Sequence, residues 1–326
     1  MNVIVIGLGS MGKRRIRLIQ KIHPEYVITG VDTSSQRCDQ AAKTFAIPTS
    51  SCLDEALTQG ADCAFVCTSP ITHHGIINKC LQKNLHVFTE LNLVADGYEE
   101  NMHLAQKNER ILFLSSTFLY RDEIEYIKQR TLASNCLLNY SYHVGQYLPD
   151  WHPWENYKDF FVNNRRTNGC REIFAIEFPW LTDIFGELID VIVQKGKASR
   201  LDIDYNDHYL LLTRHASGVK GLLAVDVLSR KPVRNFELFG EELYISWDGS
   251  PHGLYEYNCS NKENIHISLY ESLDKLSGYS NQIIENAYQK EILNFFKAIE
   301  GVETQRYSFE KDLHIIEWIN RIELDY

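Results

Sequence analysis

Three glycines near the N-terminus have the spacing of a dinucleotide-binding turn. Four apolar residues, 3–6, lead directly into Gly7, Gly9 and Gly12, which form a G-x-G-x-x-G pattern at the start of a helical segment. The first glycine permits the tight strand-to-helix turn, the second lets a pyrophosphate approach the backbone, and the third lets helix and strand pack closely. The N–H groups and positive dipole end of the helix then face the phosphates. The pattern predicts a cofactor site that includes Gly7, Gly9, Ser10, Met11 and Gly12.

An acidic residue follows at the position that selects between the two nicotinamide cofactors. Asp32 ends the next apolar strand, residues 26–31, and stands twenty residues after Gly12. A carboxylate there accepts hydrogen bonds from the adenosine ribose and repels a 2′-phosphate. We therefore expect NAD, while four nearby cations keep NADP possible: Lys13, Arg14, Arg15 and Arg37.

Strands that alternate with helices must position these residues. Further apolar runs at 61–67, 85–89 and 111–115 are separated by helical patterns, which is typical of parallel βαβ units with helices on both faces of the sheet. Ligands bind such a sheet at the carboxyl ends of its strands. One crevice is therefore expected to gather the glycine turn, Asp32, Thr68, Ser69, Pro70, Glu90 and Thr117.

The pattern changes after residue 118. Residues 137–147 alternate apolar and polar side chains, residues 173–192 are mostly helical in pattern, and later segments alternate again between turns. The expected later strands are 209–215, 220–229, 233–239, 243–247, 254–257 and 265–269, closed by helices at 281–300 and 309–324. The predicted fold is α/β, with a Rossmann doubly wound parallel sheet in residues 1–118. Residues 119–326 form an α+β domain for substrate binding and oligomerisation, with an open, mainly antiparallel sheet.

Composition limits the class of partner. The chain has 326 residues, a net charge of −10, 44% hydrophobic and 23% charged residues, which indicates a soluble globular protein and argues against nucleic acid or an acidic membrane as a partner. No signal peptide and no apolar run of about 20 residues is evident. The eight cysteines form no C-x-x-C pair, so we expect reduced thiols in a cytoplasmic protein. No tight His/Cys cluster suggests a metal site.

Two short motifs make a family resemblance specific. A T-S-P-x-x-H segment ends at His73, and an H-V-F-x-E segment runs from His86 to Glu90. With the glycine turn and Asp32, they make the chain resemble the Gfo/Idh/MocA (glucose–fructose oxidoreductase, inositol dehydrogenase) family over essentially its whole length. The resemblance implies that His73 orients the loop under the cofactor and that Glu90 lies near the nicotinamide ribose. It also implies a homodimer or homotetramer.

One position departs from the family pattern. The family usually has Glu-Lys-Pro where this chain has Glu90, Leu91 and Asn92, and the family lysine assists proton transfer at the substrate hydroxyl. Leu91 can neither donate nor accept a proton. One hypothesis is therefore a non-catalytic dinucleotide-binding regulator or assembly protein. Another keeps catalysis but reduces and reoxidises a tightly held NAD within one cycle.

Three residues are candidates for the missing acid–base group. Residues 170–179 are the nearest counterpart of the family's D-x-G-x-H segment, with Glu172 at or beside the aspartate position and Glu177 one residue from the histidine position. A buried glutamate with a raised pKa can act as a base near neutral pH. Ion-paired structural acids are the alternative for both glutamates. His143, on the strand that enters the following loop, is the third candidate, either as a proton shuttle or as a structural histidine.

An aromatic loop is the candidate for substrate recognition. Aromatic faces pack on sugar rings and arginine forks bind phosphate or carboxylate, although plain packing is equally open for the tryptophans. The residues concerned are Tyr147, Trp151, Trp154, Arg165 and Arg166. The sequence thus predicts an NAD(P)-dependent oxidoreductase that moves a hydride to or from a secondary alcohol of a sugar, sugar acid or nucleotide-sugar. The resemblance suggests bacterial surface-polysaccharide or nonulosonic-acid synthesis as its setting.

Overall fold

The computed structural model of the chain describes residues 1–151, 155–274 and 283–324. It divides into two compact units. The first takes Met1–Thr117 with Tyr288–His314, and the second takes Phe118–Ala287 with Ile315–Tyr326. The sequence predicts a boundary between residues 118 and 119; the structure also assigns a C-terminal segment to the first unit. Within the described residues, no helix is long and apolar enough to cross a membrane.

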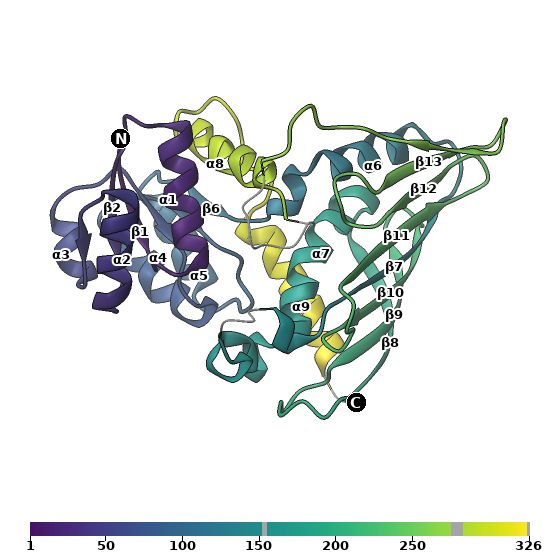
Figure 1. Cartoon of the computed structure of the whole chain (residues 1–326), viewed down its shortest axis with the longest axis horizontal. Helices are drawn as coiled ribbons and strands as arrows, with labels where there is room; N and C mark the ends of the chain where they lie inside the picture. Colours follow the sequence, from purple (N-terminus) through teal and green to yellow (C-terminus); the bar gives the residue numbers. More distant parts are fainter. Residues whose placement is uncertain (152–154, 275–282, 325–326) are drawn as a thin grey trace. The chain divides into compact units, whose positions relative to one another are not determined.

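The first unit, whose N-terminal part is coloured purple to blue in Figure 1, is built on a six-stranded parallel sheet. The strand order is β3-β2-β1-β4-β5-β6. This order is that of a doubly wound dinucleotide-binding sheet, as predicted. Its elements are β1 (Asn2–Ile6), α1 (Ser10–Ile22), β2 (Val27–Val31), α2 (Ser35–Phe45), β3 (Thr49–Ser50), α3 (Leu53–Thr58), β4 (Cys63–Val66), η1 (Pro70–Thr72), α4 (His73–Gln82), β5 (His86–Thr89), α5 (Tyr98–Lys107) and β6 (Leu112–Leu114).

Aromatic packing explains why a C-terminal segment joins this unit. Phe65, Phe88 and Phe113 lie side by side on β4, β5 and β6, with ring centroids 4.7 and 5.1 Å apart. Phe295 of helix α8 (Glu285–Ile299) meets all three rings edge-on at 5.2 to 5.6 Å. Such edge-to-face pairs add to the free energy gained by burying the rings. Helix α8 therefore completes the core of the parallel sheet.

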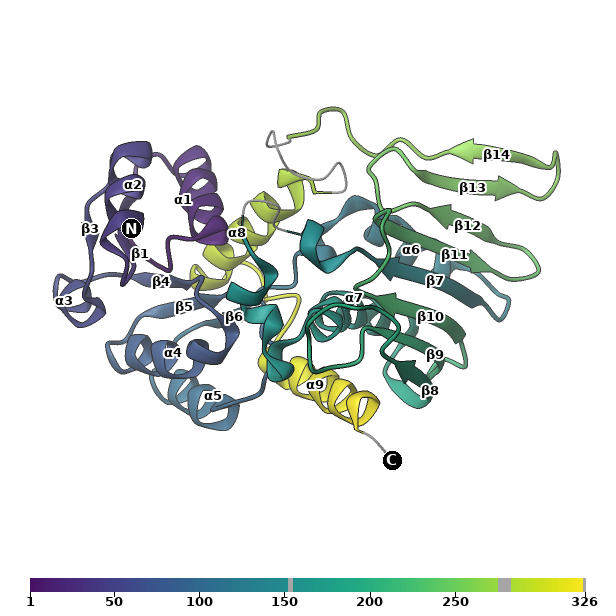
Figure 2. The same ribbon diagram turned by 60° about the horizontal axis from the view of Figure 1, so that its bottom comes forward.

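The second unit is built on an eight-stranded sheet with the order β14-β13-β12-β11-β7-β10-β9-β8 (Figure 2). Its strands pair antiparallel except β7 and β10, which are parallel, so the predicted mainly antiparallel sheet is confirmed. Its elements are η2 (Thr117–Tyr120), α6 (Asp122–Ala133), β7 (Asn139–Gly145), η3 (Leu148–Asp150), η4 (Tyr157–Asp159), η5 (Phe161–Asn163), η6 (Arg165–Thr167), α7 (Gly169–Phe185), β8 (Leu188–Gly196), β9 (His208–His215), β10 (Lys220–Asp226), β11 (Val233–Phe239), β12 (Tyr244–Trp247), β13 (Leu254–Asn258) and β14 (Glu263–His266). Helix α9 (Phe309–Glu323) closes the chain and contributes to both units.

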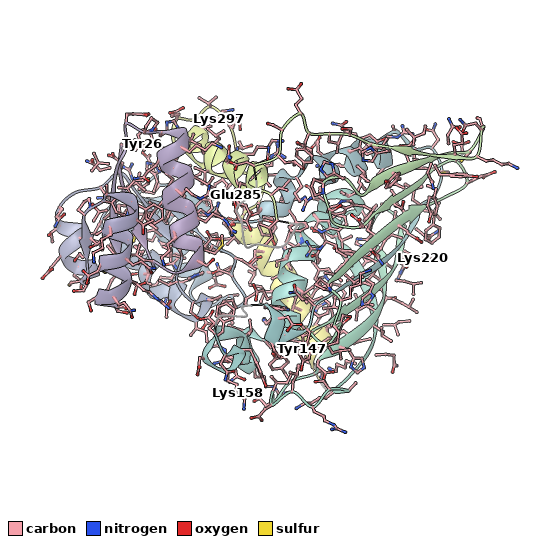
Figure 3. The ribbon with its side chains drawn as sticks, in the orientation of Figure 1. Tyr26, Tyr147, Lys158, Lys220, Glu285 and Lys297 are labelled. Carbon is pink, nitrogen blue, oxygen red and sulfur yellow. The ribbon has the colours of Figure 1, made fainter. Side chains whose placement is uncertain are left out.

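The two faces of this sheet differ. Tyr140 and Tyr142 of β7 are buried against α7, where their rings pack on Phe185 and Trp180. Side chains alternate along a strand, so His143 lies on the opposite face. Figure 3 shows the exposed Lys220 of β10 on that face, directed away from α7. We call this second face the open face of the sheet.

The segment after residue 173 differs from the expectation of one interrupted helix. Helix α7 continues through Pro179 and ends at Gly186, which adopts a left-handed φ of 82°. Residues 188–196 then form strand β8, paired antiparallel with β9. The run Ile189–Val193 is rich in β-branched residues, which pack well on a pleated surface and favour a strand here.

Candidate functional site

The glycine turn has the geometry that phosphate binding requires. Gly7 has a φ of 93°, and a Cβ there would lie 2.6 Å from the carbonyl oxygen of Cys67. A Cβ on Gly12 would lie 1.8 Å from the Gly7 oxygen, whereas one on Gly9 would have no heavy atom within 4 Å. Space is therefore open at Gly9, where Ser10 and Met11 begin α1. This space and the first-turn N–H groups fit the pyrophosphate of a dinucleotide.

Asp32 is tied into the same turn. Its carboxylate accepts hydrogen bonds from the backbone N–H of Leu8 at 2.8 Å and of Ser34 at 2.9 Å. These bonds hold the carboxylate at the carboxyl end of β2, next to the glycines. A fixed acceptor at this place fits a ribose hydroxyl.

The four cationic residues near the glycine turn differ in how well they could contact the 2′-phosphate of NADP. Arg14 and Arg15 are buried, so neither is offered to solvent. The Lys13 ammonium donates to the Gln40 side chain at 2.6 Å. The Arg37 guanidinium is 56% exposed and lies 3.6 Å from the Asp32 carboxylate, which makes Arg37 the best-placed cation for NADP.

A buried histidine supports the loop that follows β4. His73 contacts the carbonyl oxygen of Thr68 through Nε2 at 2.9 Å and the side chain of Asn92 through Nδ1 at 2.5 Å. Burial lowers the pKa of His73, so the ring is neutral. These contacts fix the loop that carries Ser69 and Pro70 against the segment after β5. The arrangement suits the orienting role that the resemblance implies.

Glu90 follows β5 and is held by an arginine. Arg15 of α1 contacts both carboxylate oxygens of Glu90, at 2.6 and 3.2 Å. From the sequence, Arg15 is expected only as a possible ligand of the NADP phosphate. Because Arg15 and Glu90 are 75 residues apart, no local pattern predicts that they form an ion pair. The half-buried Leu91 comes next, so no lysine follows Glu90.

Glu177 is fully enclosed in the second unit. Its carboxylate pairs with Arg234 at 2.6 Å and accepts hydrogen bonds from the Tyr142 hydroxyl and the Trp180 indole N–H, both at 2.7 Å. Glu177 as a whole is 0% exposed to solvent. This environment favours the structural alternative for Glu177, with Arg234 as its ion-pair partner.

Glu172 has a different environment on the same helix. It lies five residues before Glu177 and four before the half-buried Ile176, so it shares the Ile176 face of α7. Among the described residues, its buried Oε2 atom has no hydrogen-bond partner. Burial raises the pKa of Glu172 to about 7. A carboxyl group with this pKa can take or give a proton near neutral pH.

His143 forms a dyad with Asp226, which lies 83 residues away and which no local sequence signal pairs with it. The Nε2 atom of His143 lies 2.7 Å from the Asp226 carboxylate, which also accepts a hydrogen bond from the Ser229 hydroxyl. Burial alone would raise the pKa of Asp226, but the hydrogen bonds from His143 and from backbone N–H groups outweigh it, so the pKa of Asp226 is lowered. A Cβ on Gly145 would lie 2.4 Å from this carboxylate, so glycine makes room for it. The dyad lies on the open face of the sheet and Glu177 on the α7 side. The structure therefore does not bring His143 and Glu177 together.

The aromatic loop places its residues in several settings. The Arg230 guanidinium stacks on the ring of Tyr147 at 4.1 Å, and the Trp151 indole donates to the Gln146 carbonyl at 3.0 Å. Arg165 and Arg166 are exposed on η6. Trp154 lies outside the described residues. Figure 3 labels Tyr147 and also Lys158, which pairs with Asp202.

Comparison with protein families and with curated proteins gives two matches. Residues 1–116 match the model of an oxidoreductase family with an NAD-binding Rossmann fold, GFO_IDH_MocA. Biliverdin reductase A of Mus musculus is 26% identical over 138 residues, which cover 42% of this chain and 46% of that protein. The chain thus spans about half the length of this curated relative.

Solved structures share the fold across both units. UDP-N-acetylglucosamine 3-dehydrogenase GnnA of Acidithiobacillus ferrooxidans aligns with a TM-score of 0.75 at 17% identity, covering 99% of this chain and 96% of that one. The WlbA dehydrogenase of Bordetella pertussis, in complex with NADH and UDP-GlcNAcA, aligns with a TM-score of 0.73 at 13% identity, covering 99% and 95%.

The predicted nicotinamide cofactor is confirmed by the NAD-binding family that matches the glycine turn and Asp32. The motifs that carry the resemblance lie within the matched residues. Residues 1–116 of this chain therefore match the NAD-binding Rossmann domain of the Gfo/Idh/MocA oxidoreductase family.

Proposed function

We propose that the chain is an NAD-dependent oxidoreductase that interconverts a secondary alcohol and a ketone on a sugar, sugar acid or nucleotide-sugar. The observation that carries this proposal is the environment of Glu172, a half-buried residue whose buried Oε2 atom has no hydrogen-bond partner among the described residues and whose pKa is raised by burial to about 7. A family oxidoreductase without the usual lysine needs another group to exchange the hydroxyl proton. Glu172 has the chemistry for that task, with His143 and Glu177 as the weaker candidates.

The protein's part in the reaction is positioning and one proton transfer. When bound, the nicotinamide ring exchanges a hydride with the alcohol carbon. In the oxidation direction, the Glu172 carboxylate takes the hydroxyl proton as the C–H bond breaks. In the reduction direction, protonated Glu172 gives that proton back to the carbonyl oxygen. Arg165, Arg166 and the aromatic residues Tyr147, Trp151 and Trp154 would bind the anionic and ring parts of the substrate.

The substrate class draws on the loop and on the structural neighbours. The two neighbours described above carry UDP-sugar names or ligands, which supports a nucleotide-sugar. The proposed setting is bacterial surface-polysaccharide or nonulosonic-acid synthesis. The test is hydride transfer with NAD or NADH against sugars, sugar acids, nucleotide-sugars and biliverdin. Turnover on one sugar class supports the proposal, whereas turnover on biliverdin alone would replace the substrate class.

Leu91 supports a second candidate, a non-catalytic dinucleotide-binding regulator or assembly protein. A chain with this role would bind NADH and turn over no member of the panel. The third hypothesis, an internal redox cycle, predicts that NAD stays bound through purification. Absorbance of the denatured supernatant at the nicotinamide band separates it from simple dehydrogenation.

The preference for NAD is expected to depend on Asp32 and Arg37. We expect Asp32→Ala to weaken NAD about tenfold and NADP less, because only NAD loses a ribose acceptor while NADP also loses a repulsive charge. Arg37→Ala is the matched control, which should weaken NADP and leave NAD nearly unchanged. Titration calorimetry with both cofactors measures this. Tighter binding of NADP than NAD by the unmodified protein would contradict the assignment.

We also propose a homo-oligomer formed through the open face of the sheet. Ile192, Leu212 and Leu222 face one another across β8, β9 and β10, and each is at least 50% exposed. An exposed aliphatic row of this kind is typical of an interaction surface. We expect light scattering to give a dimer or tetramer at micromolar concentration and a smaller species for Leu212→Glu. A monomeric parent protein would contradict the proposal.

A further inference from the structure

The side chain of Arg15 is completely buried in the first unit, between two carboxylates. Its Nε and Nη2 atoms contact Glu90 at 2.6 and 3.2 Å, and Nη2 also lies 2.8 Å from Glu291 of α8. The guanidinium stands 4.5 Å from the ring centroid of Phe88 and 5.2 Å from that of Tyr288. Charge pairing and ring contacts therefore fix the plane of the guanidinium.

Glu291 is itself fixed by the segment that follows β6. Its Oε1 atom accepts hydrogen bonds from the Ser115 hydroxyl at 3.0 Å and the Ser116 N–H at 2.8 Å. Its Oε2 atom accepts from the Thr117 hydroxyl at 3.0 Å, in addition to Arg15. Helix α8 thus holds the far side of Arg15 and ties it to the last residues of the first unit before Phe118.

Glu90 is the member of this cluster that reaches solvent. Its side chain is 12% exposed, whereas those of Arg15 and Glu291 are 0% exposed. It stands at the carboxyl end of β5, the edge at which ligands bind a parallel sheet. Two hydrogen bonds from a planar fork set the rotation of its carboxylate, which a lysine ammonium acting as a point charge cannot do.

We propose that Arg15 is a positioning residue that presents the Glu90 carboxylate to the nicotinamide half of the cofactor, with Glu291 anchoring Arg15 from behind. The inference rests on the proposed function. Glu90 follows β5 and Asp32 follows β2, so they lie on opposite sides of β1, and a dinucleotide whose adenosine ribose is at Asp32 extends its nicotinamide half toward Glu90. An acceptor that is fixed before the ligand arrives loses less freedom on binding. Loss of the fork must then weaken contacts to the nicotinamide half and leave those to the ADP half intact.

Arg15→Lys tests this with two ligands, NADH and ADP-ribose, which lacks the nicotinamide. We expect the Kd of NADH to rise roughly ten- to hundredfold, the effect of one charge-assisted hydrogen bond, and the Kd of ADP-ribose to stay within about twofold. Equal weakening of both ligands, or of neither, would overturn the proposal. A parent protein that binds ADP-ribose but not NADH would instead refute the proposed function.

A double-mutant cycle with Glu90→Gln separates positioning from a structural effect. If Arg15 acts through Glu90, Arg15→Lys should weaken NADH little further in the Glu90→Gln background. Additive effects would overturn the inference. Tyr307→Phe, which removes a buried hydrogen bond to Asp312 in the same unit, controls for general destabilisation and should leave both affinities unchanged. Should Arg15→Lys not fold, Glu291→Gln removes the charge that anchors Arg15 from behind, which loosens the Arg15–Glu90 contact, and is expected to show the same selective loss to a smaller degree.

Discussion

Replacement of Glu172 by glutamine is expected to lower kcat by about 10²- to 10⁴-fold, the usual contribution of general acid–base catalysis. The glutamine side chain keeps the shape of the glutamate and cannot accept the hydroxyl proton. In the parent protein, kcat/KM for alcohol oxidation should rise with pH through about 7, because the pKa of Glu172 is raised to about 7 and the carboxylate is the active form. The reverse reaction should fall over the same range, and the variant should lose both dependences.

The same substitution should raise stability at alkaline pH. The pKa of Glu172 is raised from 4.5 to about 7 on folding, so between these values the folded protein binds more protons than the unfolded chain, and stability falls as pH rises. The loss is complete above about pH 8 and amounts to about 3 kcal/mol at 1.36 kcal/mol per pKa unit. Glutamine does not ionise, so Glu172→Gln should melt several degrees above the parent protein at pH 8.5 and close to it at pH 5.

A matched variant on the same helix controls for the change from acid to amide. Asp183 pairs with Lys128 at 2.7 Å on a partly exposed surface. Asp183→Asn should leave kcat and its pH dependence unchanged and change stability by less than about 1 kcal/mol. Full activity in Glu172→Gln would move the acid–base role to His143 or Glu177.

The parallel sheet could be predicted because its signals are local. The apolar run of β1, the three glycines and Asp32 lie within one βαβ unit, and each requirement is met by a residue type at a short spacing. The sequence does not predict strand β8, because its apolar residues follow α7 closely and resemble a continuation of that helix. Gly186 marks the break, since its left-handed φ ends the helix.

The ion pairs of the candidate site could not be predicted in the same way. Arg15 and Glu90 are 75 residues apart, and Glu177 and Arg234 are 57 apart, so only the tertiary fold joins them. The position of His143 did have a signal. Tyr140, Tyr142 and Val144 form the apolar series of β7, which places His143 on the opposite face.

Glu177→Ala is expected to cost about 3–5 kcal/mol of stability, as removal of one partner of a buried ion pair does. The substitution removes the acceptor shared by Arg234, the Tyr142 hydroxyl and the Trp180 indole N–H. Each of these donors lies in the packed layer between α7 and the sheet, where water does not replace a lost acceptor easily. Chemical denaturation should show the loss as a lower midpoint with an unchanged m-value.

The double variant Glu177→Ala, Arg234→Met identifies the pair as the cause. Because the second substitution removes the buried guanidinium, the double variant should recover a large part of the stability lost in Glu177→Ala. The milder Glu177→Gln keeps one acceptor oxygen and should cost about 1–3 kcal/mol, with kcat per folded molecule within a few-fold of the parent value. A stable Glu177→Gln protein whose kcat falls a hundredfold would instead make Glu177 the catalytic base, because a purely structural carboxylate affects the amount of folded protein and leaves the rate of each folded molecule unchanged.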